Sequence, residues 1–293
     1  MIQTFFDGLM IGGVYAVIAL GLTLIFGVMR VINMAHGEFV MIGMFTSYFL
    51  FGRLGLDPFI SILITAPVCY LIGYFLYRAF VSKAQKGGEV NTLLLTAGAS
   101  ILLVNVAALP AFLGPNFSRL SGEGLYWQHR IWNLAGVTFN APLLTGFLLT
   151  GLLILLLSLF LKKTDTGLAM RAAAQQPLAA QIVGVNVSVI SGVTFGLGAV
   201  FAGVAGSVLS TTYPIYASIG ALFLVKAFVI VVLGGMGSIP GAALGGLVLG
   251  VVESFGATYI TGGTAYRDVF GLVIFLIVLL YRPQGLFGKG PNT

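Results

Sequence analysis

Three polar residues interrupt the apolar N-terminal third of the chain. Asn33, His36 and Glu38 lie within six residues of one another, between two strongly apolar runs. Ionisable groups at membrane depth are costly and usually face a cavity or one another. We therefore expect these residues to fix a helix break or shape a translocation path rather than bind substrate directly. The alternative is that they cap the second helix at the cytoplasmic interface. Neither His36 nor His129 has neighbours that would complete a metal site, so none is expected.

A lysine inside a later apolar run raises a second question of placement. The nine residues from Lys226 to Gly234 would form about 13.5 Å of helix, close to half of a bilayer core. Two arrangements remain open. In the first, Lys226 reaches the outer surface of the membrane while Gly234, Gly235 and Gly237 lie near the midplane. In the second, Lys226 forms an ion pair with Glu253.

The segment 164–187 is too polar to cross a membrane and too long for a minimal turn. Thr164 or Asp165 can cap a first short helix, Pro177 suits the first turn of a second, and Gly184 its C-terminal cap. The pattern predicts a structured helical projection. An ordinary alanine-rich loop is the alternative, although loops of this length inside a domain are usually functional or disordered.

The elements that position these residues must be membrane helices. Of the 293 residues, 58% are hydrophobic and 8% are charged, and the mean hydropathy is +1.06, which is far from the composition of a water-soluble domain. Because lipid offers no hydrogen bonds and the runs lack strand-like alternation, helices are expected. The chain is predicted to be an all-α polytopic membrane protein with about eight to ten transmembrane or broken helices, in one domain over 1–293. The apolar runs are 4–28, 38–52, 59–77, 92–113, 142–161, 187–212, 217–234, 240–260 and 269–281.

Basic residues predict the orientation in the membrane. Two clusters separated by two crossings belong in the cytoplasm: Arg78, Lys83 and Lys86, and then Lys162, Lys163 and Arg171. Counting outward places the N-terminus and the segment 114–140 outside, and Arg282 with Lys289 inside. The net charge of +6 is thus a topology signal and not a nucleic-acid surface. Cys69 is the single cysteine, so no disulfide framework is expected.

Two stretches form a weak internal repeat. Residues 24–43 and 231–246 each read as an apolar helix, a glycine or polar break, and another helix. Paired discontinuous helices point to a transport site near the bilayer midplane, so we expect the breaks at 33–38 and 234–241 to approach each other. Chance similarity is the alternative, because the chain has 41 glycines.

The sequence resembles the LivH-type permease subunits of branched-chain amino acid ABC importers over nearly its whole length. The resemblance rests on 21–28, 33–39, 226–228, 234–241, 282–288 and the segment 164–187. It implies a type II ABC-importer-like fold in a bacterial inner membrane, with 164–187 as the loop that docks into a cytoplasmic ATPase. The matching loop positions are Gly167, Ala169, Arg171, Ala172, Ala179 and Gly184. The implied partners are a LivM-like second permease, two ATPase subunits and a periplasmic substrate-binding protein, with an amino acid as substrate.

Other functions remain in competition. The chain has no G-x-x-x-x-G-K-[ST] phosphate loop, so ATP hydrolysis must come from partners, and no enzymatic activity or cofactor is expected. Related permeases for urea, amides or sugars share the architecture, although the 33–38 motif disfavours sugars. A proton-coupled secondary transporter using His36, Glu38 or Glu253 is a further alternative, but it has no need of the segment 164–187.

Overall fold

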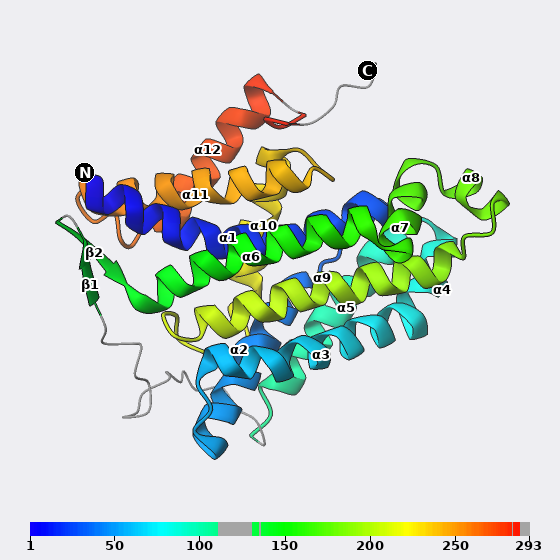
Figure 1. Ribbon diagram of the computed structural model, residues 1–293, viewed down its shortest axis with the longest axis horizontal. Coiled ribbons are helices and arrows are strands. Elements are labelled where there is room, and N and C mark those ends of the chain that lie inside the picture. The colour runs from blue at the N-terminus through cyan, green and yellow to red at the C-terminus, as the bar shows by residue number, and fades with distance from the viewer. Residues whose placement is uncertain (111–130, 135, 283, 288–293) are drawn as a thin grey trace.

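Three long helices lie side by side with the longest one. The computed structural model describes residues 1–110, 131–134, 136–282 and 284–287. Helix α1 (Ile2–Met29) is buried along almost its whole length and contacts α6 (Ala141–Lys163), α9 (Val187–Leu209) and α11 (Ile239–Tyr259) (Figure 1). The first apolar run therefore forms the centre of the protein.

The other helices surround this group. They are α2 (His36–Leu54), α3 (Pro58–Leu76), α5 (Glu89–Ala107), α10 (Ile219–Gly234) and α12 (Arg267–Tyr281). Helix α3 continues through a π-helical turn (Tyr77–Val81) into the short α4 (Ser82–Ala84) and a 3-10 turn (Gln85–Gly87). Each of the nine predicted apolar runs thus contains a helix, although the runs 92–113 and 187–212 extend past their helices and residues 111–113 lie outside the described part.

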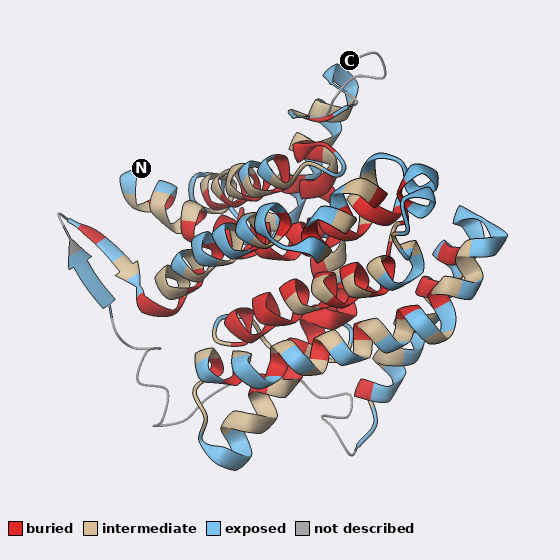
Figure 2. Ribbon diagram, turned by 45° about the vertical axis from the view of Figure 1, so that its right-hand side comes forward, coloured by how far each residue is buried: buried red, intermediate tan, exposed pale blue. Residues whose placement is uncertain are grey.

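Six of the described helical segments are long and apolar enough to cross a membrane, and α10 is a shorter apolar helix. The prediction of a multi-pass helical membrane protein is confirmed. Figure 2 shows buried residues along the inner helices and exposed ones along the outer helices. One small element was not predicted: β1 (Ile131–Leu134) and β2 (Val137–Asn140) form an antiparallel hairpin, with Ile131 opposite Asn140.

Glycine allows the inner helices to touch backbone to backbone. A Cβ on Gly8 of α1 would lie 2.7 Å from Val251 Cα of α11, and one on Gly12 would lie 2.9 Å from Leu247 Cα. Gly43 of α2 meets the carbonyl of Gly203 of α9 in the same way. Small residues at such crossings are typical of membrane helices, which gain packing contacts by close approach.

The two basic clusters lie at one end of the helix group. Helix α4 follows Arg78 and contains Lys83. It lies at the same end as α7 (Asp165–Gln175) and α8 (Pro177–Ile182), which follow Lys162 and Lys163, whereas the N-terminus and the hairpin lie at the other end (Figure 1). This arrangement agrees with the orientation predicted from charge. His129, Lys289 and most of the segment 114–140 lie outside the described residues.

Candidate functional site

The first helix break folds back into the protein. Asn33 is fully buried, and its Oδ1 accepts a hydrogen bond from the Ala35 N–H at 3.1 Å. The buried His36 Nε2 lies 2.9 Å from the Ile18 carbonyl oxygen of α1. Ile18 comes eleven residues before Met29, the end of α1, so α2 begins about 16 Å back along that helix. Of the two alternatives for this motif, the structure has the buried break rather than a cap at the interface.

The start of α2 contacts two other helices, α5 through Glu38 and α10 through Gly37. Glu38 Oε1 accepts a hydrogen bond from Ser100 Oγ of α5 at 2.9 Å, and nearby Met34 N–H donates to Thr96 Oγ1 of the same helix at 3.2 Å. The neighbouring Gly37 lies against the carbonyl of Gly220, at the start of α10. Glu38 Oε2 has no hydrogen-bond partner among the described residues. The carboxyl group therefore holds α5 beside the break.

The second break follows α10. Gly235 and Gly237 adopt φ values of 97° and 82°, a backbone that glycine takes without a steric penalty. The break is closed by the chain end, because Leu286 N–H donates to the Leu233 carbonyl at 2.8 Å and Phe287 N–H to the Gly234 carbonyl at 3.2 Å. These bonds satisfy acceptors that the end of a helix leaves open.

The two breaks are not brought together at their polar and glycine residues. Gly37 of α2 lies beside Gly220, which is at the start of α10. Gly234 is the last residue of α10, about 21 Å further along that helix. Gly237 instead lies close to Gly27, near the end of α1.

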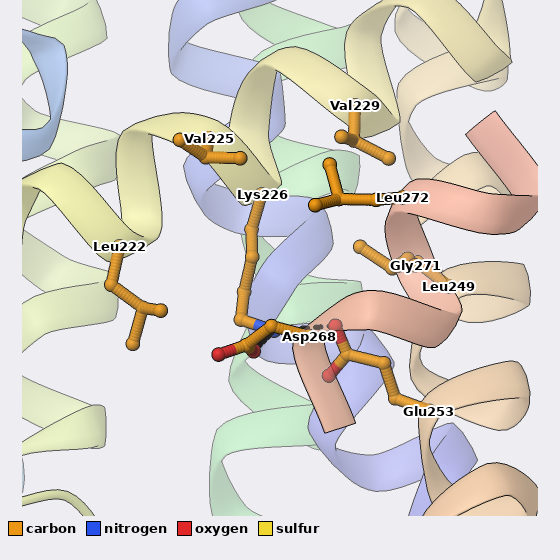
Figure 3. Close-up of a pocket in the computed structure, with 9 residues that line it drawn as sticks. All are labelled: Leu222, Val225, Lys226, Val229, Leu249, Glu253, Asp268, Gly271 and Leu272. Atoms are coloured by element: carbon orange, nitrogen blue, oxygen red, sulfur yellow. Dashed lines mark hydrogen bonds and ion pairs between the residues drawn. The ribbon is translucent and has the colours of Figure 1, made fainter. Parts of the chain in front are cut away.

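Lys226 belongs to a network of charges in which Lys226 and Glu253 are buried and Asp268 is partly exposed. It forms ion pairs with Glu253 of α11 and, at 2.6 Å, with Asp268 of α12 (Figure 3). Of the two arrangements expected for Lys226, the structure therefore contains the ion pair with Glu253. Lys226 Nζ also lies 4.9 Å from the ring centroid of Tyr15, near the middle of α1.

Further residues complete this network. Tyr15 Oη donates to Glu253 Oε2 at 3.1 Å and lies 2.8 Å from Tyr213 Oη. Arg267 Nε lies 3.4 Å from Glu253 Oε2. Sequence reasoning missed the roles of Tyr15, Arg267 and Asp268, because they come from segments far apart in the chain. Their only signal is the placement of charged or hydroxyl groups inside or beside apolar runs. Among the described residues, no group of His, Cys, Asp or Glu is arranged to hold a metal ion.

The segment after α6 folds into two short capped helices. Thr164 Oγ1 accepts from the Gly167 N–H at 3.0 Å to cap α7 (Asp165–Gln175), and Pro177 opens α8 (Pro177–Ile182). Gly184 has a φ of 91°, and the Val185 N–H next to it closes the end of α8 on the Ala180 carbonyl at 2.9 Å. The predicted helical projection and its caps are confirmed.

The loop residues expected to contact an ATPase divide by exposure. Gly167 is buried, and a Cβ there would lie 2.6 Å from Leu161 Cα, so this glycine lets α7 fold against α6. Ala169 and Ala172 are partly buried, whereas Arg171, Ala179 and Gly184 are exposed. The sequence analysis overlooked three aliphatic side chains that are 77%, 85% and 78% exposed: Leu178, Ile182 and Val183. We call these three the α8 patch.

The crossing helices, interrupted at two points and joined to a structured projection at one end, define a multi-pass membrane permease. The chain belongs to the family described as "Branched-chain amino acid transport system / permease component", which matches residues 4–279.

Named relatives cover nearly the whole chain. It is 35% identical to the high-affinity branched-chain amino acid transport system permease protein BraD of Pseudomonas aeruginosa, over 98% of this chain and 96% of that protein. It is 31% identical to the LivH permease protein of Escherichia coli, with the same coverage. It is also 27% identical to the E. coli LivM permease protein, over 93% of this chain and 67% of LivM.

A solved structure shares the fold. A chain of PsaBC from Streptococcus pneumoniae, in complex with Fab, superposes with a TM-score of 0.52 at 14% sequence identity and covers 98% of both chains. At this identity, the likeness concerns the fold alone.

Proposed function

We propose that this chain is a pore-forming subunit of an ATP-driven importer that moves branched-chain amino acids from the periplasm to the cytoplasm across a bacterial inner membrane. The family and the names of the 31–35% identical relatives support this substrate class. Similarity to both LivH and LivM supports pairing with a second, LivM-like permease. Two cytoplasmic ATPases and a periplasmic binding protein complete the proposed assembly.

The observation that carries the proposal is the α8 patch. Leu178, Ile182 and Val183 are almost fully exposed, and they sit on a projection at the end where the basic clusters lie. Adjacent exposed aliphatic side chains in water mark a protein contact. We infer that an ATPase covers the patch, with Arg171 and Ala179 exposed on the same projection.

The projection is mechanically connected to the transmembrane helices. Helix α7 contacts α1, α6 and α9 as well as α8, and Gly167 and Met170 on α7 are buried. A displacement of α8 by a bound ATPase would therefore be passed through α7 to the central helices. This provides a physical route by which nucleotide-driven movement could switch the access of the pathway from one side to the other.

Reconstitution of the assembly tests the proposal. The chain is co-expressed with its candidate partners, and leucine uptake is measured in proteoliposomes with ATP inside and the binding protein outside. Uptake should require ATP, survive collapse of the proton gradient, and stop when a partner's nucleotide site is disabled. Uptake by this chain alone in ATP-free vesicles, following an imposed proton gradient, would replace the proposal with a secondary transporter.

A matched pair of variants tests the docking surface. Ile182→Asp puts a charge into the α8 patch and should abolish co-purification of the ATPases, because burying an unpaired charge is costly. Gln181→Glu introduces the same charge at the neighbouring exposed position outside the patch and should leave the complex intact. Normal ATPase binding by Ile182→Asp would remove the docking assignment.

A further inference from the structure

A cavity of about 510 Å³, lined by both polar and apolar side chains, lies at the end of the helix group opposite the α7–α8 projection. It borders Leu143 near the start of α6, whereas α7 follows the far end of that helix. Helices α1, α10, α11 and α12 and the connections after α9 and α11 complete its wall. Its polar lining includes Asp7, Tyr213, Thr264, Arg267 and Asp268. In the proposed orientation this cavity opens toward the periplasm.

Two opposite charges at the start of α12 border this cavity. Arg267 borders the cavity with a side chain that is 34% exposed, and its buried Nε forms an ion pair with Glu253 Oε2 at 3.4 Å without a hydrogen bond among the described residues. The Asp268 side chain is 55% exposed and reaches inward to Lys226. A partly exposed guanidinium and a reachable carboxylate therefore lie on adjacent residues of one cavity wall.

An apolar recess of about 130 Å³ adjoins the charged pair. Its aliphatic lining comes from α10, α11 and α12: Leu222, Val225, Val229, Leu249 and Leu272. Lys226, Glu253 and Asp268 stand at its polar end (Figure 3). Leu222 and Asp268 border both the recess and the larger cavity, so the charges and the aliphatic lining meet at one place.

We propose that this place is a binding site for a zwitterionic α-amino acid with an aliphatic side chain. The substrate carboxylate binds the Arg267 guanidinium, its ammonium group binds Asp268, and its side chain enters the recess beside Leu222. The inference rests on the proposed function and adds the residues that recognise the substrate within this subunit.

Three physical features favour this ligand over a singly charged one. The planar guanidinium matches a carboxylate with parallel hydrogen bonds. The start of α12 adds the positive end of a helix dipole, which favours the same carboxylate. When the substrate ammonium group forms an ion pair with Asp268, Lys226 keeps its ion pair with Glu253. The buried lysine is therefore not left unpaired.

Protection from cysteine labelling tests the site. Thr264 is exposed and lines the cavity, so Thr264→Cys is introduced with Cys69→Ala into the complete complex in nanodiscs, without binding protein. Leucine at millimolar concentration should slow maleimide labelling several-fold. Neither 4-methylpentanoate, which lacks the ammonium group, nor 3-methylbutylamine, which lacks the carboxylate, should protect. Equal protection by either analogue would overturn zwitterion recognition.

Charge-neutralising variants with matched controls identify the residues. Arg267→Gln and Asp268→Asn should each abolish protection by leucine. Arg267→Lys keeps the charge but loses the planar guanidinium group, and it should weaken the protection. Arg53→Gln, at a cation–π contact with Phe49 on α2, and Glu89→Gln, exposed on α5, should leave protection unchanged. If Arg267→Gln fails to fold, Asp268→Asn at its half-exposed position carries the test, and full protection in that variant overturns the site.

The same complex separates this inference from the proposed function. With binding protein and ATP added, it is assayed for leucine uptake. Uptake by a complex in which leucine gives no protection would overturn the site and leave the proposed function standing. Absence of uptake of any branched-chain amino acid by the wild-type assembly would overturn the proposed function itself.

Discussion

The imidazole of His36 lies 2.9 Å from the carbonyl oxygen of Ile18, so the first residue of α2 is bound to the middle of α1. Both residues are buried. This contact fixes the level at which α2 begins and keeps the polar segment before it inside the helix group. The break is thus a folded structure with its own hydrogen bonds.

Removing this hydrogen bond should destabilise the chain. His36→Ala leaves the packing around Ile18 incomplete, and the expected loss is about 1–3 kcal/mol of unfolding free energy. Denaturation in mixed detergent micelles measures it. Ser82→Ala is the control, because Ser82 also donates to a carbonyl, at 3.1 Å, but on an exposed turn. Equal stability of the two variants would show that the His36 contact contributes nothing.

A pair of glycine substitutions tests the close crossing of α2 and α9. Gly43→Ala places a methyl group against the Gly203 backbone and should destabilise by about 1–3 kcal/mol. Gly98→Ala makes the same change in α5, where nothing lies within 4 Å of the new methyl group, and should be neutral or stabilising by up to about 1 kcal/mol. Thermal unfolding of the purified chain compares them. A tolerated alanine at Gly43 would mean that the helices separate easily.

The buried ion pair should show energetic coupling. Lys226→Met leaves Glu253 with Arg267 and Tyr15 as partners, and Glu253→Gln leaves Lys226 with Asp268 as its ion-pair partner. Breaking a buried pair costs about 3–5 kcal/mol, and because each residue keeps another partner we expect values at the lower end. A double-mutant cycle in mixed micelles should give a coupling of at least about 1 kcal/mol. The control cycle, Lys226→Met with Glu89→Gln, should be additive.

A variant of Glu38 distinguishes ATP-driven transport from proton-driven transport. Glu38→Gln retains an oxygen that accepts from Ser100 Oγ but cannot carry a proton through a cycle. We expect leucine uptake that is reduced at most, still requires ATP and is insensitive to a protonophore. Complete loss of accumulation in Glu38→Gln, together with protonophore sensitivity in the wild type, would indicate proton coupling instead.

The helices were predictable from the sequence because lipid imposes a simple rule. A long apolar run in a membrane must be helical, and Thr164, Pro177 and Gly184 mark helix ends by local chemistry that needs no tertiary information. The charge network was harder to predict. Lys226 and Glu253 appeared as one of two alternatives, but Asp268 was not connected to them, because packing between α10 and α12 cannot be read from either run alone.

The hydrogen bond between His36 and Ile18 illustrates the same limit. Nothing in the spacing of the two residues shows that the chain turns back along α1. The α8 patch was overlooked for a different reason. Leu178, Ile182 and Val183 look like core residues in the sequence, and their exposure follows only from the position of α8 outside the helix group.

The return of the chain end to α10 has a consequence for biosynthesis. The carbonyls of Leu233 and Gly234 receive their bonds from residues 286 and 287, about fifty positions later in translation. At the usual translation rate of about 5–20 residues per second, these carbonyls remain without their partners for several seconds after α10 has been synthesised. During that interval the end of α10 has to be solvated by water or held by the insertion machinery. A chain that stops before residue 286 would therefore leave the last carbonyls of α10 without these hydrogen bonds.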